Sequence, residues 1–209
     1  MGLDLKKHWN EIYQSKSDSE LGWYESDGST TLEFLQGISL EGKKIFLPGA
    51  GTTKLIPQLL EDNSQIIASD ISDAALTQIS QQWPELNREP HQVFQLDLGS
   101  ELNSAKNQIP KVDIWIDRAV LHFLTEDQQV KNYFQRLKNS CSSGSYVLLA
   151  EFAYGGALKC ATLPVRHYST KDYQRELGLE FKLIKEMPYT FINPRGEDRL
   201  YQFALFQAK

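Results

Sequence analysis

The sequence predicts an α/β protein whose mostly parallel sheet ends in an antiparallel hairpin. Over the first two thirds of the chain, short apolar strand-like segments alternate with segments in which apolar residues recur at helical spacing. Strands that alternate with helices are typical of right-handed crossovers and a parallel sheet. The last two strand-like segments are joined by too few residues for a crossover helix, so we expect them to pair as a hairpin.

The first three strands are expected at residues 43–48, 65–70 and 92–97. A glycine turn follows the first strand, and the leucines and isoleucine of residues 55–60 then repeat at helical spacing. Pro57 stands early enough in that segment to be tolerated in a first turn. Ser72 and Asp73 are typical of a helix N-terminus, which predicts a helix through about Gln82.

The second part of the chain begins with a fourth strand at residues 112–117. Helical spacing of apolar residues predicts a helix over residues 126–140. Gly144 is expected to break it before a fifth strand at residues 146–152. The terminal hairpin is expected to pair residues 180–191 with residues 200–208.

Length, charge and composition limit the classes of function that the protein can have. A chain of 209 residues is long enough for one α/β domain, and its net charge of -5 disfavours a nucleic-acid partner, which requires clustered Lys and Arg. No apolar run approaches a membrane span and the first residues carry no secretory signal, so we expect a cytoplasmic protein without a membrane partner. Cys141 and Cys160 lack metal-ligand spacing and are expected to be free thiols, and we expect no metal site.

The strongest motif joins the glycine turn to an acid. Gly49 and Gly51 follow the first strand, and Asp70 ends the second. Glycines let the backbone turn tightly and approach a ligand, and an acid about 20 residues further on accepts hydrogen bonds from ribose hydroxyls. The combination predicts a nucleoside site. Dinucleotide sites carry a third glycine where this chain has Lys54, so S-adenosylmethionine, which has no pyrophosphate, fits better than NAD.

Four segments together resemble the successive motifs of the class I S-adenosylmethionine-dependent methyltransferases: residues 8–13, 45–51, 68–72 and 112–119. The resemblance runs over nearly the whole chain. It implies a Rossmann-like three-layer sandwich whose seven strands have the order 3-2-1-4-5-7-6, with the last strand antiparallel. It also implies one domain over residues 1–209, in which residues 1–40 form a helical lid segment and residues 41–209 the core.

One position departs from that family. Most members carry an acid two positions before the first glycine, where this chain has Leu47. Pro48 and Gly49 are instead similar to the thiopurine and thiol methyltransferase branch, and Thr52 and Thr53 offer hydroxyls in place of the missing acid. The resemblance implies S-adenosyl-L-methionine as the cofactor. The residues expected to bind it are Trp9, Trp23, Gly49, Ala50, Gly51, Thr53, Asp70, Ile71, Asp97, Leu98 and Asp117.

The resemblance also assigns roles within this set. Asp70 is expected to hold the ribose hydroxyls, and Asp97 and Leu98 to lie near the adenine. Trp9 and Trp23 belong to an N-terminal arm that covers the cofactor in related enzymes. Plainer interpretations stay open, because Asp is common in turns and aromatic side chains usually pack in a core.

The expected acceptor site combines the end of the fourth strand with the loop after the fifth. The candidate catalytic residues are Arg118, His122, Tyr154 and Arg166. His122 is placed on the helix after the fourth strand, and His167 and Tyr168 are further candidates in the loop. Arg166 suits a carboxylate on the acceptor. Alternatively, Arg118 pairs with an acid, His122 is a packing histidine, and Arg166 and His167 are solvated loop residues.

The sequence therefore predicts transfer of a methyl group to a small molecule, with a thiol or another soft nucleophile as acceptor. Two alternatives stay open: a protein methyltransferase acting on Lys or a terminal amine, and a non-catalytic nucleoside-binding module. Residues 117–120 read Asp-Arg-Ala-Val, which lacks the Asn/Asp-Pro-Pro-Tyr-type motif of many N-directed methyltransferases. An NAD-dependent reductase is disfavoured by Lys54 and by the terminal hairpin.

Overall fold

The computed structural model describes residues 4–102 and 108–209. The chain divides into two compact units, the first ending at Asp97 and the second beginning at Leu98. The label η denotes a short 3-10 helix. The elements of the first unit, in chain order, are α1 (Leu5–Ser15), η1 (Asp18–Glu20), α2 (Ser29–Phe34), β1 (Lys44–Leu47), α3 (Ile56–Glu61), β2 (Gln65–Asp70), α4 (Asp73–Gln82), η2 (Pro84–Asn87) and β3 (Gln92–Gln95).

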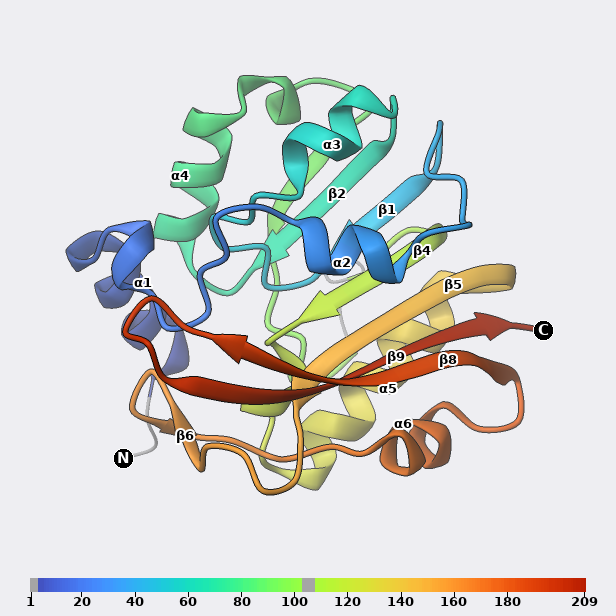
Figure 1. Cartoon of the computed structure of the whole chain (residues 1–209). Coiled ribbons are helices and arrows are strands. Elements are labelled where there is room, and N and C mark those ends of the chain that lie inside the picture. Colours follow the sequence, from blue (N-terminus) through green and yellow to red (C-terminus); the bar gives the residue numbers. More distant parts are fainter. Residues whose placement is uncertain (1–3, 103–107) are drawn as a thin grey trace. The chain divides into compact units, whose positions relative to one another are not determined.

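The second unit contains the following elements (Figure 1): β4 (Val112–Arg118), η4 (Leu121–Phe123), α5 (Asp127–Ser140), β5 (Cys141–Phe152), β6 (Lys159–Cys160), β7 (Leu163–Pro164), α6 (Thr170–Leu177), β8 (Phe181–Ile192) and β9 (Asp198–Ala208). The strand order of the main sheet is β3-β2-β1-β4-β5-β9-β8. Because β6 and β7 form a separate two-stranded sheet, this order confirms the expected 3-2-1-4-5-7-6.

The strands of the first unit are parallel, as their alternation with helices predicts. β1 pairs with β2, and β2 pairs with β3, both in parallel register. The residues of β2 from Ile66 to Asp70 are buried on both faces, which is typical of a parallel strand covered by helices. α4 begins where the sequence predicts it, because the Ser72 hydroxyl accepts a hydrogen bond from the Ala75 amide.

The terminal hairpin is confirmed in the second unit. β4 pairs with β5 in parallel, whereas β9 is antiparallel to both β5 and β8. Figure 1 shows β8 and β9 as two long strands lying side by side. The centre of β9, from Phe203 to Phe206, is buried, whereas half-buried and exposed residues alternate along β8 up to the buried Phe191. The hairpin therefore closes the sheet with β8 as an edge strand.

Two expected boundaries are wrong. The third strand ends at Gln95 rather than at residue 97. The fifth strand begins at Cys141 directly after α5, because Cys141 already has extended backbone angles, and Gly144 lies within the strand. A shift in the register between Val112 and Ile114 of β4 accommodates the extra residues. His122 lies on a short 3-10 helix after the fourth strand, η4, which precedes α5.

α6 is a helix that the sequence analysis did not predict. Ser169 and Asp172 form a capping box, in which each side chain accepts the backbone N–H of the other residue. Gly178, with φ of 80°, ends the helix in a conformation that favours glycine. The Ser-x-x-Asp pattern before Tyr173 and Leu177 was the local signal for this element.

Candidate functional site

The glycine turn of the first unit has the backbone conformation that its sequence predicts. Gly49 and Gly51 have φ angles of 50° and 51°, a left-handed region that costs other residues about 1–2 kcal/mol. Between them, the Ala50 amide donates to the carbonyl of Ser69 at the end of β2 (2.8 Å). The Gly51 amide donates to the Asp70 carboxylate (3.0 Å). The turn and the end of β2 are therefore joined as the nucleoside motif requires.

Asp70 is a buried carboxylate, with 5% of its surface exposed. One oxygen accepts the Gly51 amide and the other accepts the Ser72 amide (2.9 Å). Burial raises the pKa of Asp70 to about 6, although the hydrogen bonds from Ser72 and Gly51 act in the opposite direction. A carboxylate offers about four acceptor positions, and the amides of Ser72, Gly51 and Ile71 leave room for a further donor such as a ribose hydroxyl. This geometry fits the role expected of Asp70.

An aromatic cluster from the N-terminal arm packs beside the turn. Trp9 and Trp23 meet edge to face with ring centroids 5.3 Å apart, and Tyr13 lies within 6.5 Å of both rings. A Cβ atom at Gly51 would come within 2.4 Å of the Tyr13 hydroxyl, so the arm approaches the turn as closely as glycine allows. Tyr13 therefore lies against the turn, and the expected lid residues Trp9 and Trp23 pack against Tyr13 and against each other.

The acid missing at Leu47 is supplied to the turn by another segment. Leu47 is buried, and the Asp18 carboxylate of η1 instead accepts the Thr52 hydroxyl (2.6 Å). The other Asp18 oxygen lies 2.9 Å from the Lys54 ammonium. The Thr53 hydroxyl is used differently, since it accepts the Leu55 amide at the start of α3 (3.3 Å). Sequence analysis missed Asp18 because no local pattern relates it to the glycine turn.

Three further residues expected at the cofactor have different environments. The Ile71 carbonyl accepts the Gln95 side chain (2.9 Å), which joins the end of β2 to the end of β3. Asp97 is exposed in the first unit, and Leu98 is buried in the second. Their expected proximity to adenine stays a prediction.

A buried acidic network lies at the ends of β4 and β5 in the second unit. Asp117 accepts the Tyr133 hydroxyl (2.5 Å), which in turn accepts the Trp115 indole N–H (3.0 Å). Asp117 is fully buried, and burial together with the nearby Glu151 charge raises the pKa of its carboxyl well above the ordinary range. The Asp117 carboxyl is directed at Tyr133 of α5.

Glu151 connects this network to His122. The Nδ1 atom of His122 lies 2.6 Å from a Glu151 oxygen, and both side chains are fully buried. Glu151 also accepts the amides of Val120, Leu121 and His122, and so holds the turn η4. Burial raises the pKa of Glu151 to about 7 and lowers that of His122 to about 3. Sequence analysis missed Glu151, although an acid in an otherwise apolar strand was a usable signal.

His122 has the environment of a packing histidine, whereas its catalytic role stays a prediction. Its ring stacks on Phe152 with centroids 4.5 Å apart, as a packing histidine would. Among the residues that the structure describes, no hydrogen-bond partner reaches its Nε2 atom. Nearby, the Arg118 guanidinium lies over the rings of Phe191 and Tyr201, at 5.1 and 5.6 Å from their centroids. Arg118 is therefore held by aromatic faces.

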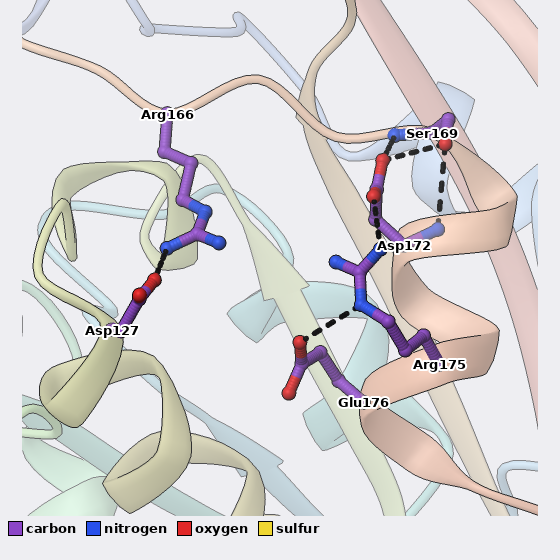
Figure 2. Close-up of polar contacts among 6 residues, drawn as sticks. All are labelled: Asp127, Arg166, Ser169, Asp172, Arg175 and Glu176. Atoms are coloured by element: carbon purple, nitrogen blue, oxygen red, sulfur yellow. Dashed lines mark hydrogen bonds and ion pairs between the residues drawn. The ribbon is translucent and has the colours of Figure 1, made fainter.

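The candidate acceptor-site residues in the loop after β5 differ in their contacts and in their exposure to solvent. Figure 2 shows the Arg166 guanidinium directed at Asp127 of α5, with which it forms an ion pair at 2.8 Å. The backbone amide of Arg166 donates to the His122 carbonyl (2.8 Å), so the loop lies against η4. His167 Nε2 lies 2.8 Å from the Ala157 carbonyl, and Tyr154 is 60% exposed.

The last of these loop candidates, Tyr168, is buried and stacks on a tyrosine of α6 with ring centroids 5.4 Å apart.

Among the described ranges 4–102 and 108–209, no group of three or more His, Cys, Asp or Glu residues is arranged to hold a metal ion. No helix in those ranges is both long and apolar enough to span a membrane.

Solved structures of other proteins share the fold of this chain. The solved structures most like the chain include a protein studied in the conversion of a disulfide bond into a thioacetal group during echinomycin biosynthesis, with a TM-score of 0.73 and 14% identity over 98% of this chain and 93% of that one. A SAM-dependent methyltransferase from Anabaena variabilis has a TM-score of 0.71 and 12% identity, covering 100% of this chain and 96% of that one. The fold is that of the S-adenosylmethionine-dependent methyltransferases.

The sequence similarity to the thiopurine methyltransferase branch is also seen in a comparison with a known protein. The chain is 23% identical over 193 residues to a thiopurine S-methyltransferase from Acinetobacter baylyi, covering 85% of this chain and 87% of that protein. No profile of a known protein family matches the chain. The expected resemblance to the class I methyltransferases, with similarity to the thiopurine branch, is confirmed.

Proposed function

We propose that this protein transfers a methyl group from S-adenosylmethionine to a small molecule that presents a thiol or another soft nucleophile. The observation that carries the proposal is the buried Asp70 carboxylate joined to a left-handed glycine turn. This arrangement has acceptor capacity left for a ribose hydroxyl and no third glycine for a pyrophosphate. The methyltransferase fold and the similarity to a thiopurine S-methyltransferase support the same conclusion.

The first unit would hold the cofactor. Asp70 would accept the ribose hydroxyls, and the glycine turn would lie against the thioether end. When bound, the cofactor supplies an electrophilic methyl group on a sulfonium. Residues 1–40 would act as the lid, because Tyr13 already lies against Gly51 and the two tryptophans pack beside it. This lid would keep water from the methyl group.

The low pKa of His122 in the second unit favours an acceptor substrate that loses its proton without a strong base. His122 is the candidate proton acceptor, but burial lowers its pKa to about 3, which makes it a weak base at neutral pH. A thiol, whose ordinary pKa is about 8.5, forms its reactive thiolate without a strong base. An amine or an alcohol would need one. Methyl transfer to such a soft nucleophile mainly requires alignment of the nucleophile with the methyl carbon.

Binding tests the cofactor assignment. The purified protein is titrated by calorimetry with S-adenosylmethionine, S-adenosylhomocysteine and NAD. The proposal expects binding of the first two and none of NAD. Binding of NAD alone would show that the glycine turn serves a dinucleotide.

Turnover tests the acceptor. Methyl-labelled cofactor is incubated with panels of small thiols, amines and carboxylates, and with a protein extract. Label on thiols alone supports the proposal. Label on protein lysines or terminal amines would favour a protein methyltransferase, and cofactor binding without transfer to any panel would favour a non-catalytic nucleoside-binding module. His122→Gln is expected to lower turnover while leaving S-adenosylhomocysteine affinity within about twofold, because the side chain belongs to the acceptor side.

A further inference from the structure

Glu151 is a fully buried acid of β5 whose two carboxyl oxygens are both fixed by the backbone. One oxygen accepts the amides of Val120 and Leu121 (3.4 and 3.3 Å), and the other accepts the amide of His122 (3.0 Å). Backbone N–H groups can only donate, so these bonds favour the ionised carboxyl over the protonated one. Glu151 is therefore a fixed hydrogen-bond acceptor beside η4.

The two nitrogens of the His122 imidazole have different neighbours. Nδ1 lies 2.6 Å from the oxygen of Glu151 that accepts the His122 amide, which is close enough for a proton to pass between them. Nε2 is buried, and no residue that the structure describes forms a hydrogen bond with it. The contact at Nδ1 is not aligned as a hydrogen bond either, which is common in catalytic groups before a substrate binds. A buried nitrogen without a partner destabilises the fold, so its presence points to a ligand that donates to Nε2.

Packing fixes the plane of the ring between these two neighbours. The imidazole stacks on Phe152 with an angle of 4° between the rings, and the ring centroid of Phe123 lies 4.3 Å away. The carbonyl of His122 also accepts the Arg166 amide (2.8 Å), which holds the backbone of η4 against the loop after β5. A ring held in this way keeps Nδ1 at Glu151 and leaves Nε2 for the ligand.

The electrostatics of the pair favour a proton on the carboxyl rather than on the ring. Burial lowers the pKa of His122 to about 3, whereas it raises the pKa of Glu151 to about 7. A general base is most effective when its pKa is close to the pH at which it works. If Nδ1 gives a proton to Glu151 while Nε2 receives another, the imidazole never becomes charged, and its low pKa does not oppose the transfer.

We infer that Glu151 is a positioning residue of the acceptor site, which acts through His122 by taking up the proton that the thiol loses. The S–H bond of the thiol breaks and its proton binds Nε2, while the Nδ1–H bond breaks and that proton binds the Glu151 carboxylate. The imidazole stays neutral and exchanges its protonated nitrogen. The inference rests on the proposed function, and it adds that the thiol binds in its protonated form, as the donor to Nε2.

The protonated nitrogen of His122 in the wild type tests this relay without any turnover. Nitrogen NMR of protein with isotope-labelled histidine reports it, and the signals of His122 are those missing in His122→Gln. As pH falls through about 7, Glu151 gains its proton, and the protonated ring nitrogen is expected to change from Nδ1 to Nε2 while the ring stays neutral. A ring that becomes charged in this range, or that keeps one protonated nitrogen throughout, would overturn the inference.

Other titratable and charged groups interact with the pair. They are Asp117 and Arg118 of β4, Tyr133 of α5, His167 and Tyr168 of the loop after β5, and Tyr173 of α6. Burial raises the pKa of each of the three tyrosines above its ordinary value, so they stay protonated near neutral pH. Glu151→Gln separates the remaining groups, because a change of protonated nitrogen that persists in this variant would come from another residue and would overturn the inference.

Turnover of benzyl mercaptan, a small thiol, gives an independent test. Glu151→Gln keeps the size of the side chain but cannot take up the proton. It is expected to lower kcat at least about tenfold and to change KM for the thiol less than about threefold. Because only ionised Glu151 accepts a proton, the ratio of wild-type to variant kcat is expected to rise as pH rises through about 7. This ratio cancels the ionisation of the thiol itself, so a ratio that is flat with pH would overturn the inference.

Two further variants separate the relay from a structural role. Glu151→Asp keeps a titrating carboxyl and is expected to retain the rise of kcat with pH, so it reports on the site even where the glutamine variant is unstable. Ser145, earlier in β5, is the matched control, because its buried hydroxyl donates to the Val112 carbonyl (2.7 Å). Ser145→Ala is expected to keep the wild-type pH dependence, and its loss there would overturn the inference. No methyl transfer to any thiol would contradict the proposed function itself, whereas the NMR result in the wild type decides the role of Glu151 alone.

Discussion

The buried carboxyl of Asp70 makes cofactor binding depend on pH in a direction that the structure determines. Burial raises its pKa to about 6, from an ordinary value of 3.8. Below that pKa the carboxyl is protonated, and it accepts donors from a ribose less well than the carboxylate does. Ligand hydroxyls therefore favour the ionised form, and affinity is expected to rise with pH until Asp70 is fully ionised.

The magnitude follows from the fraction ionised. With a pKa of about 6, roughly a tenth of the protein carries the carboxylate at about pH 5, and nearly all of it does at about pH 7.5. If only the ionised form holds the ribose, affinity increases about tenfold between those pH values, or about 1.4 kcal/mol. Because the pKa of Asp70 is higher in the folded state than in the unfolded chain, ionising this carboxyl lowers the free energy of unfolding by about 3 kcal/mol. This stability is lost as pH rises from about 4 to about 6.

The assay is calorimetric titration with S-adenosylhomocysteine over this pH range, in wild type and in Asp70→Asn. The variant cannot ionise at this position, so its affinity is expected to be flat with pH and about 1.5–3 kcal/mol weaker than the wild type at the upper end. Asp73→Asn, which removes an exposed acid near the start of α4, is the control and should keep the wild-type profile. A flat wild-type profile, or the same slope in Asp70→Asn, would refute the assignment of Asp70 to the ribose.

Three further predictions concern stability and are measured by urea unfolding. Both Gly42 and Gly51 have positive φ, but only Gly51 is crowded by a tyrosine hydroxyl. Gly42→Ala is expected to lower the free energy of unfolding by about 1–2 kcal/mol, and Gly51→Ala by more. Equal losses would exclude the contact at Gly51. Tyr133→Phe should cost about 1–3 kcal/mol by leaving buried Asp117 without its donor, and an unchanged midpoint would count against the network. Ser169→Ala should cost about 1 kcal/mol by removing the cap of α6, whereas a neutral effect would mean that the capping box is not formed in solution.

The features that the sequence determined are those whose physical causes are local. Alternating strand and helix patterns predicted the parallel sheet, and the short connection before β9 predicted the hairpin. Gly49, Gly51 and Asp70 were identified because a left-handed turn needs glycine and the spacing from turn to acid spans one strand-helix-strand unit. The cap at Ser72 is equally local, since a helix N-terminus needs an acceptor close in sequence. The cap at Ser169 was available by the same reasoning and was overlooked.

Only the tertiary structure decided which distant side chains share a site. Asp18 reaches Thr52, and Glu151 reaches His122, because packing of the arm and pairing of β4 with β5 bring together residues that are far apart in sequence. Charge states were decided in the same way, since burial sets the pKa values of Asp70 and Glu151 and burial is a property of the packed chain. Local patterns specify backbone conformation over a few residues, whereas contact and dielectric environment depend on the whole fold.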